Sequence, residues 1–341
     1  MMDGYAVGAE DAAERFRVIG EIAPGGESSL AVQAGECVRI FTGGAVPPGA
    51  SQVLKQEDVS RDGEWMTPAR RDAVRFIRPR GAEARPGDVV LAAGTVLGPA
   101  ELAILAQIGH VRPSVSRSPR VAHLATGGEL ADPAAPLAPG QIRDTNSSLI
   151  AALVAESGAE LVAHARCGDD LARIVSFIRE NPADLLLISG GASVGEHDFG
   201  ARALRESGYT IHFDKINLRP GKPLTFATRG AEVAVVIPGN PVSHFVCFHV
   251  GIRLVIECLL GRAPRWEFLD LPLGGDTALR RDARETFWPA RVFAREGRLI
   301  AEPLRWSSSG DTFALAGTNA LIRLAADREP GAAMPVLLLN R

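Results

Sequence analysis

The sequence lacks the hallmarks of several protein classes. Its four cysteines (Cys37, Cys167, Cys247 and Cys258) show no paired spacing such as CxxC. This scatter argues against a zinc site or a disulfide framework, and it favours small buried side chains in a reducing compartment over a metal or redox role. Residues 1–11 contain acids and no apolar signal-peptide core, so we expect a cytoplasmic protein.

Long apolar runs and excess charge are lacking as well. The most apolar stretch, residues 248–261, contains Arg253 and Glu257 and falls short of the ~20 uncharged residues that a membrane span needs. Its apolar residues recur at helical spacing, which predicts a core helix. The formal net charge of −3 argues against general binding to nucleic acids or anionic membranes. Any anion site must therefore be built locally.

Glycine and proline, in contrast, are plentiful. The 36 glycines and 23 prolines predict many turns, and 341 residues exceed what one ordinary core holds. We expect an α/β-plus-β fold, in which a central three-layer α/β domain is flanked by small β domains. The predicted parts are a small β domain (16–78), a connecting segment (79–117), the α/β domain (118–265) and a C-terminal β-barrel-like domain (266–341).

Residues 118–265 alternate strand and helix patterns. One helix opens at the candidate caps in residues 144–146, and another opens at Asp169 or Asp170. The unbroken apolar strand 184–189 indicates a sheet that is covered on both faces. This is the pattern of an open, mostly parallel α/β sheet.

The flanking segments are rich in turns and short strands. Residues 62–65 predict a hairpin turn, and short strands recur after Pro264. Residues 79–117 predict a turn, a strand and then a helix that opens near Pro99. The apolar side of that helix would consist of Ala103, Leu105, Ala106 and Ile108.

Three strands of the α/β part end in glycine-containing loops, at residues 126–129, 189–191 and 238–241. In an open parallel sheet, ligands bind at the carboxyl ends of the strands. Glycine lets the backbone approach a ligand closely, and amides of the first helical turn attract anions. One such loop alone is commonplace in a strand–helix turn. Three at the same sheet edge predict an anion site.

Carboxylates follow the same strands. Glu129, Asp169 and Asp198 each lie just past a predicted strand, and hard oxygen ligands of this kind suit Mg²⁺. Asp169 and Asp198 could instead cap their helices. His197, beside Asp198, is disfavoured as a general base, because no serine or cysteine nucleophile signature accompanies it.

Cations occur on a rigid turn. Lys215, Arg219 and Lys222 surround the segment Pro220, Gly221 and Pro223. Lysines in loops are usually solvated, and that reading stays open here. A merely solvated charge, however, does not require two prolines and a glycine. A fixed cationic cradle suits a phosphate or a small oxyanion.

These motifs together resemble one protein family. In order, the sequence contains MDGYAV, RIFTGGAVPPGA, TGGEL, GQIRDTN, ISGGASVGEHDF, RPGKP and PGNPVS. From Met2 to about residue 325, the chain resembles the molybdopterin molybdenumtransferases, namely the bacterial MoeA proteins and the gephyrin E domain. The resemblance implies insertion of molybdate into adenylylated molybdopterin, with Mg²⁺ and release of AMP. It also implies an elongated homodimer, with 1–15 and 79–117 as the dimerisation part.

The resemblance also assigns site residues. It implies that the catalytic residues Asp3 and Thr42 are contributed across the dimer. The pterin and metal side would comprise Glu129, Asp169, Ser189, Gly190, Gly191, Ser193 and Asp198. The anion side would comprise Lys215, Arg219, Lys222, Pro238, Gly239, Asn240, Pro241, Ser243, Arg291 and Ser309.

The sequence departs from the family pattern in three places. Relatives carry a helical segment before the MDG motif, so we expect the first domain to lack that piece. Gly128 replaces the acid of the usual TGDEL, and Arg219 replaces the first lysine of the usual KPGKP. These departures keep an alternative open, namely a catalytically impaired molybdopterin-binding scaffold or delivery partner. Further partners would be other cofactor-biosynthesis proteins and apo-molybdoenzymes, and tungstate could replace molybdate.

Overall fold

The computed structural model describes residues 2–26, 29–191, 199–275 and 278–339. The chain divides into two compact units, Met1–Ala92 and Ala93–Arg341, and each is described by itself. The first unit contains one six-stranded sheet with the order β4-β1-β3-β2-β6-β5. Its strands are β1 (Gly4–Val7), β2 (Phe16–Ile22), β3 (Glu36–Ile40), β4 (Gln52–Lys55), β5 (Val59–Asp62) and β6 (Trp65–Pro68).

Strand β1 belongs to this sheet, where it pairs antiparallel with both β3 and β4. Tyr5 and Val7 enter one apolar cluster and Ala6 enters the other, so β1 contributes to both faces. A Cβ on Gly4 would lie 1.9 Å from the Leu54 carbonyl oxygen, so only glycine fits there. The predicted grouping of residues 1–15 with 79–117 therefore does not hold for the strand Gly4–Val7.

The predicted hairpin turn at residues 62–65 is confirmed. Strands β5 and β6 pair antiparallel with Asp62 opposite Trp65. Gly63 takes a φ of +57° in the two-residue turn, a conformation that glycine adopts without strain.

Residues 79–117 differ in part from their prediction. Helix α1 (Pro99–Gln107) opens at Pro99 as predicted, and the Glu101 carboxylate accepts a hydrogen bond from the Gly98 amide at 3.0 Å. The strand predicted before it does not form in the described structure. Of the four residues predicted for its apolar side, Leu105 is buried, whereas Ala103, Ala106 and Ile108 are exposed.

The α/β domain of the second unit is built on a six-stranded sheet with the order β10-β7-β11-β15-β14-β12. Strands β10, β7, β11 and β15 run parallel, and β14 and β12 add an antiparallel edge. The strands are β7 (Arg120–Thr126), β10 (Glu160–Cys167), β11 (Leu185–Ser189), β12 (Thr210–Phe213), β14 (Thr225–Arg229) and β15 (Glu232–Ile237). The sequence did not predict β14.

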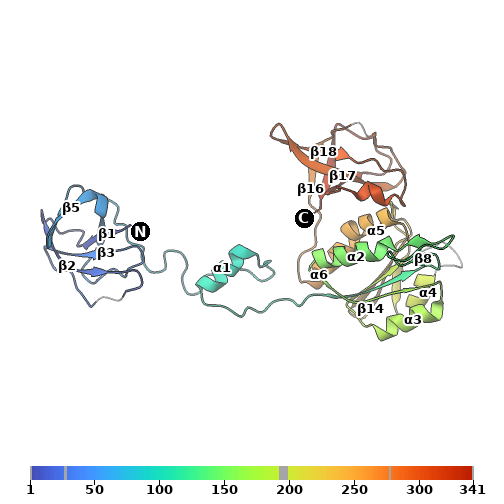
Figure 1. The fold of residues 1–341 in the computed structure, drawn as a ribbon, viewed down its shortest axis with the longest axis horizontal. Coiled ribbons are helices and arrows are strands. Elements are labelled where there is room, and N and C mark those ends of the chain that lie inside the picture. The colour runs from blue at the N-terminus through green and yellow to red at the C-terminus, as the bar shows by residue number, and fades with distance from the viewer. Residues whose placement is uncertain (1, 27–28, 192–198, 276–277, 340–341) are drawn as a thin grey trace. The chain divides into compact units, whose positions relative to one another are not determined.

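Helices cover both faces of this sheet, as the unbroken apolar strand predicts (Figure 1). In β11, Leu185 and Leu187 pack in the cluster that contains α2 and α5 residues, and Leu186 and Ile188 pack in the cluster that contains α3 and α4 residues. The domain therefore has three layers. The helices are α2 (Thr145–Glu156), α3 (Leu171–Glu180), α4 (Phe199–Glu206), α5 (Pro241–Cys247) and α6 (Arg253–Leu259).

A π-helical turn (Phe248–Ile252) joins α5 and α6 into the continuous helix Pro241–Leu259. Among the described residues it is the one helix whose length and composition would suit a membrane span, with a mean hydropathy of 1.6. Phe248, Ile252 and Ile256 are nevertheless buried in the apolar cluster beneath the sheet. The helix thus occupies the predicted core position.

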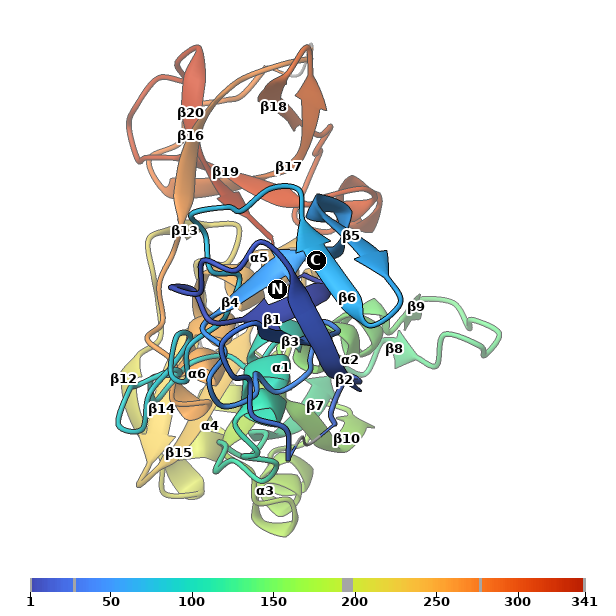
Figure 2. The same cartoon turned by 90° about the vertical axis from the view of Figure 1, so that its left-hand side faces the viewer.

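The C-terminal strands form one further sheet with the order β13-β17-β19-β20-β16, and β18 pairs with β17 (Figure 2). Strand β13 lies in the cationic turn of the α/β part, and Leu218 pairs with Glu285 and Arg219 with Thr286. The turn is thereby joined to the C-terminal domain. The strands are β13 (Leu218–Arg219), β16 (Phe268–Pro272), β17 (Glu285–Arg295), β18 (Arg298–Pro303), β19 (Ala320–Leu324) and β20 (Ala333–Leu338).

Candidate active site

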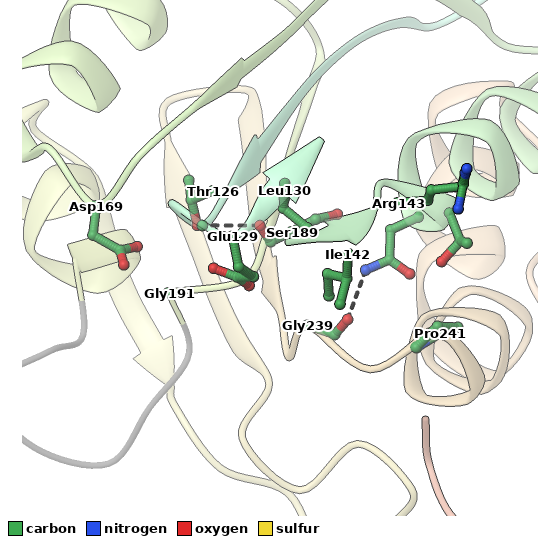
Figure 3. Close-up of a pocket in the computed structure, with 14 residues that line it drawn as sticks. Thr126, Glu129, Leu130, Ile142, Arg143, Asp169, Ser189, Gly191, Gly239 and Pro241 are labelled. Atoms are coloured by element: carbon green, nitrogen blue, oxygen red, sulfur yellow. Dashed lines mark hydrogen bonds between the residues drawn. The ribbon is translucent and has the colours of Figure 1, made fainter. Parts of the chain in front are cut away.

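The three glycine loops meet at one edge of the α/β sheet. They follow β7, β11 and β15, which are neighbours in the sheet. Together they border a cavity of about 340 Å³, called here the carboxylate cavity (Figure 3). Its lining comprises Thr126, Gly127, Glu129, Leu130, Ile142, Arg143, Thr145, Asn146, Asp169, Ser189, Gly190, Gly191, Gly239 and Pro241.

Backbone contacts fix the loop after β11. The Gly190 amide donates to the Ile237 carbonyl at 2.9 Å, and the Thr126 hydroxyl donates to the Ser189 carbonyl at 3.2 Å. Gly190 has a φ of +88°, and a Cβ on it would lie 2.4 Å from the Thr126 carbonyl oxygen. The close approach of β7 to this loop therefore requires glycine.

Two carboxylates line this cavity. Figure 3 shows Glu129 and Asp169 with their carboxylates directed toward one another. Asp170 is the cap of α3, because its carboxylate accepts from the Arg173 amide at 3.1 Å. Asp169 is therefore not the cap of α3, and it lines the cavity instead.

The third predicted metal ligand, Asp198, lies outside the described residues, together with Ser193 and His197. Among the described residues, no cluster of three or more histidine, cysteine, aspartate or glutamate side chains is present. The two carboxylates in place are hard oxygen donors, and Mg²⁺ commonly binds through one or two carboxylates plus substrate phosphates. The donor set therefore fits Mg²⁺.

A strand and helix beyond β7 complete the cavity wall. Strands β8 (Leu130–Ala131) and β9 (Ile142–Arg143) pair parallel just before α2. The Asn146 side-chain amide donates to the Gly239 carbonyl at 2.6 Å, which links α2 to the loop after β15 (Figure 3). Sequence reasoning missed Arg143 and Asn146 as site residues, although both lie in the GQIRDTN motif.

A second cavity of about 240 Å³, called here the cationic cavity, lies on the other side of the 238–241 loop. Gly239 and Pro241 line the carboxylate cavity, whereas Pro238 and Asn240 line the cationic cavity. The loop is therefore a shared wall. The cationic cavity is lined by Arg219, Pro220, Gly221, Lys222, Pro223, Pro238, Asn240, Ser243, Arg284, Trp306, Ser307, Ser308 and Ser309.

One carboxylate organises the cations of this cavity. Asp282 accepts hydrogen bonds from Arg284 Nε at 2.9 Å and from Arg219 Nη1 at 2.9 Å. The bonds from Arg284, with the nearby charge of Arg219, lower the pKa of Asp282 to about 2. Lys222 forms no ion pair within the described part of the chain, so the cavity keeps a net positive charge.

Models of three families match nearly the whole chain. The MoeA N-terminal region (domain I and II) matches residues 1–109, a probable molybdopterin binding domain matches 122–257, and the MoeA C-terminal region (domain IV) matches 275–339.

Individual relatives agree with these matches. The chain is 36% identical to a molybdopterin molybdenumtransferase of a Nostoc species, over 94% of this chain and 77% of the relative. It is 32% identical to the molybdopterin molybdenumtransferase of Bacillus subtilis, over 99% of this chain and 83% of the relative. The crystal structure of a Pyrococcus MoeA protein superposes with a TM-score of 0.83 at 26% identity and covers 100% of this chain and 87% of that one. The chain belongs to the MoeA family.

As a member of the MoeA family, the chain is a transferase of molybdenum cofactor biosynthesis. The predicted resemblance is thereby confirmed, as is the predicted fold of a central α/β domain with β-rich N- and C-terminal domains. The α/β domain that carries the carboxylate cavity is the one that matches the molybdopterin binding domain.

Two predicted MoeA residues lie together in the first compact unit. The Thr42 amide donates to the Asp3 carboxylate at 2.7 Å, and the hydrogen bonds from Thr42 hold the pKa of Asp3 below its usual value. Asp3 is thus ionised and oriented by the loop after β3.

Two other residues of the predicted MoeA anion side lie elsewhere. Lys215 is exposed and lines neither cavity. Arg291 is exposed on β17, with its guanidinium 6.0 Å from the centroid of the Phe293 ring. Arg284, immediately before β17, lines the cationic cavity in its place. No local sequence signal identifies Arg284, because it reaches the cavity through the pairing of β13 with β17.

Proposed function

We propose that this MoeA-family chain inserts molybdate into adenylylated molybdopterin, with Mg²⁺ and release of AMP. The observation that carries the proposal is the pair of cavities on either side of the 238–241 loop. One is lined by carboxylates and glycine loops, and the other by three cationic side chains. A metal-dependent phosphate site and an oxyanion site are thereby neighbours.

The carboxylate cavity suits the adenylylated pterin. Gly190 and Gly191 carry no side chains, so an anionic group can approach the backbone of this loop closely. Glu129 and Asp169 would hold Mg²⁺, and we assign the third carboxylate to Asp198. When bound, the ion would neutralise charge on the phosphate.

The cationic cavity suits molybdate. Arg219, Lys222 and Arg284 supply positive charge around a space of about 240 Å³. The hydroxyls of Ser243 and Ser309 line the same space and can donate hydrogen bonds to oxyanion oxygens.

Electrostatics explains why both cavities are needed. Molybdate, a dithiolene and an adenylyl phosphate are all anionic, so bringing them together in a low-dielectric cleft would cost several kcal/mol of repulsion, at ~4 kcal/mol per pair at 4 Å. The cations on one side and the metal on the other offset this cost. No protein nucleophile is required, because the oxyanion and water carry out the displacement.

We further propose that the chain works as a cytoplasmic homodimer. The resemblance assigns Asp3 and Thr42 to the partner subunit's site, and their mutual hydrogen bond keeps them oriented for such a role. The product would then pass to apo-molybdoenzymes, directly or through other cofactor-biosynthesis proteins.

Reconstitution tests the function. Purified protein is mixed with adenylylated molybdopterin, molybdate and Mg²⁺, and both AMP release and activation of an apo-molybdoenzyme are measured. We expect Lys222→Ala to lower AMP release at least about tenfold, because a hydrogen bond to a charged group is lost. The exposed Lys215→Ala serves as the matched control and should stay within about twofold of the unaltered chain.

The negative outcome is equally informative. A well-folded dimer that binds adenylylated molybdopterin without releasing AMP would refute insertion and support the scaffold or delivery role. Equal losses for Lys215→Ala and Lys222→Ala would remove the cationic cavity from the reaction.

A further inference from the structure

Three buried polar side chains meet beneath the carboxylate cavity. Ser189 Oγ, at the end of β11, lies 2.7 Å from His123 Nε2 of β7 and 2.7 Å from His244 Nε2 of α5. Both imidazoles are 0% exposed and Ser189 is 2% exposed. These side chains are almost fully excluded from solvent, so the hydrogen bonds that they form are made to protein groups.

The proton positions follow from the partners. His244 Nδ1 lies 3.1 Å from the Asn240 carbonyl oxygen, which can only accept, so we assign the ring proton to Nδ1. A buried neutral imidazole then has a bare Nε2, which accepts from the Ser189 hydroxyl. Burial lowers the pKa of His244 to about 4, which is consistent with the neutral form.

The same reasoning orients His123. The Ser189 hydroxyl has one proton, and it is used toward His244, so His123 Nε2 must donate to Ser189 Oγ. Burial lowers the pKa of His123 to about 3, so this ring is also neutral and its Nδ1 is bare. Within the described residues, Nδ1 of His123 has no hydrogen-bond partner. A buried acceptor without a hydrogen bond is more common in native structures than a buried N–H without one.

The chain of bonds therefore runs in one direction, from His123 through Ser189 and His244 to Asn240. Its last member lies in the 238–241 loop, the wall between the two cavities. Other bonds hold this wall at its ends: Asn146 donates to Gly239, and the Val242 amide donates to Ser309 at 3.0 Å. The His244 side chain adds a link from Asn240 in the wall to Ser189 at the end of β11, beside the backbone bond from Gly190 to Ile237.

We propose that His123, Ser189 and His244 form a one-way hydrogen-bond chain that sets the position of the wall between the cavities, and that His244 is a positioning residue for the ligands on both sides. The Ser189 hydroxyl is committed to this chain and is not a ligand. The positioning role of His244 rests on the function proposed above, whereas the hydrogen-bond chain is independent of that function.

The hydrogen-bond chain can be tested on the protein without any ligand. Nitrogen NMR of histidine-labelled protein distinguishes bare from protonated ring nitrogens. We expect His244 to carry its proton on Nδ1 and His123 on Nε2, with neither ring titrating between pH 5 and 8. The opposite tautomer at His244, or titration of either ring in that range, would overturn the proposal.

Substitution tests the positioning role. His244→Phe keeps a ring and removes both nitrogens. Both ring hydrogen bonds are lost, and we expect binding of molybdate and of adenylylated molybdopterin to weaken together, each about three- to tenfold, the effect of the one bond that reaches the wall at Asn240. His244→Asn restores a donor near the Nδ1 position and should recover much of both affinities. His249→Phe, on the same helix and lining neither cavity, is the matched control and should change neither.

The outcomes separate the two proposals. If only the melting temperature of His244→Phe changes, the positioning role is wrong. The unaltered chain could release no AMP while His244→Phe still weakens binding of both molybdate and adenylylated molybdopterin. That result would refute the proposed reaction and support the positioning role of His244. If His244→Phe does not fold, the ligand affinities of His244→Asn test the positioning role, and the tautomers of the unaltered protein test the hydrogen-bond chain.

Discussion

At the scale of single residues, Asp282 determines where the cationic cavity places its charges. Its carboxylate anchors Arg284 and Arg219, each at 2.9 Å. A guanidinium held by a carboxylate keeps N–H groups free for a second anion, since it has five donors. Arg291, exposed on β17, is not part of the cavity lining and forms no ion pair with a carboxylate in the described ranges of the chain.

This difference predicts unequal effects of two arginine substitutions. Arg284→Ala should weaken molybdate binding about tenfold or more, because charge-assisted hydrogen bonds to the oxyanion are lost. Arg291→Ala should stay within about twofold. Equilibrium dialysis with molybdate alone measures both, and a larger loss for Arg291→Ala would contradict the placement of the cavity.

The sequence pointed to most site residues but not to Arg284. Glycine loops, carboxylates and the cationic turn lie next to local signals that can be read one segment at a time. Arg284 joins the site because the neighbouring residue Glu285 pairs with Leu218, which lies far away in the sequence. No local pattern reports such a pairing.

At the scale of elements, the junction of β7 with the loop after β11 leaves no room for a side chain. Gly190 combines a φ of +88° with a 2.4 Å approach to the Thr126 carbonyl oxygen. The loop after β7 also contains Gly128, where a Cβ would meet nothing within 4 Å. The two glycines therefore serve different purposes.

Gly190→Ala should destabilise this edge of the sheet by about 1–3 kcal/mol, through backbone strain and the clash with Thr126. It should also weaken binding of adenylylated molybdopterin more than tenfold. Gly128→Ala should leave both quantities nearly unchanged. Chemical unfolding and ligand titration give the comparison, and a tolerant Gly190→Ala would show that the loop can move aside.

Prediction of elements succeeded where burial and sequence pattern agree. The fully buried strand β11 has apolar residues at its first four positions, and both of its faces are covered. The prediction of a strand before Pro99 was wrong, because the apolar residues there are not buried. Val89 is 82% exposed there, between Gly87 and Gly94, which both have positive φ, so its apolar character reflects no core.

At the scale of the whole molecule, three buried histidines in the described part of the chain make folding sensitive to acid. Burial lowers the pKa of His123 to about 3 and those of His244 and His249 to about 4. His123 faces His164 and His244, His244 faces Asp144, and His249 faces Arg253. Each ring binds a proton more readily in the unfolded chain.

The folded protein should be less stable in acid than at neutral pH. Because the folded pKa values lie below 6.5, the stability that the neutral rings confer is complete above about pH 6.5 and is lost as the pH falls toward 4. Each histidine can add up to about 1.4 kcal/mol per pH unit to the slope. Thermal unfolding at pH 7.5 and pH 5 should show the loss, and His249→Gln should reduce it. An unchanged midpoint at pH 5 would contradict neutral burial.

The pairing of β13 with β17 has an evolutionary consequence. Arg219 and Lys222 belong to the α/β region, and Arg284 belongs to the C-terminal region. The two-residue pairing of β13 with β17 brings all three into the cationic cavity. Recombination between the regions 122–257 and 275–339 would separate Arg219 and Lys222 from the Arg284 with which they share the cavity. Neither region supplies all three cations of the cavity, so an exchange of one region for that of a distant relative should weaken oxyanion binding.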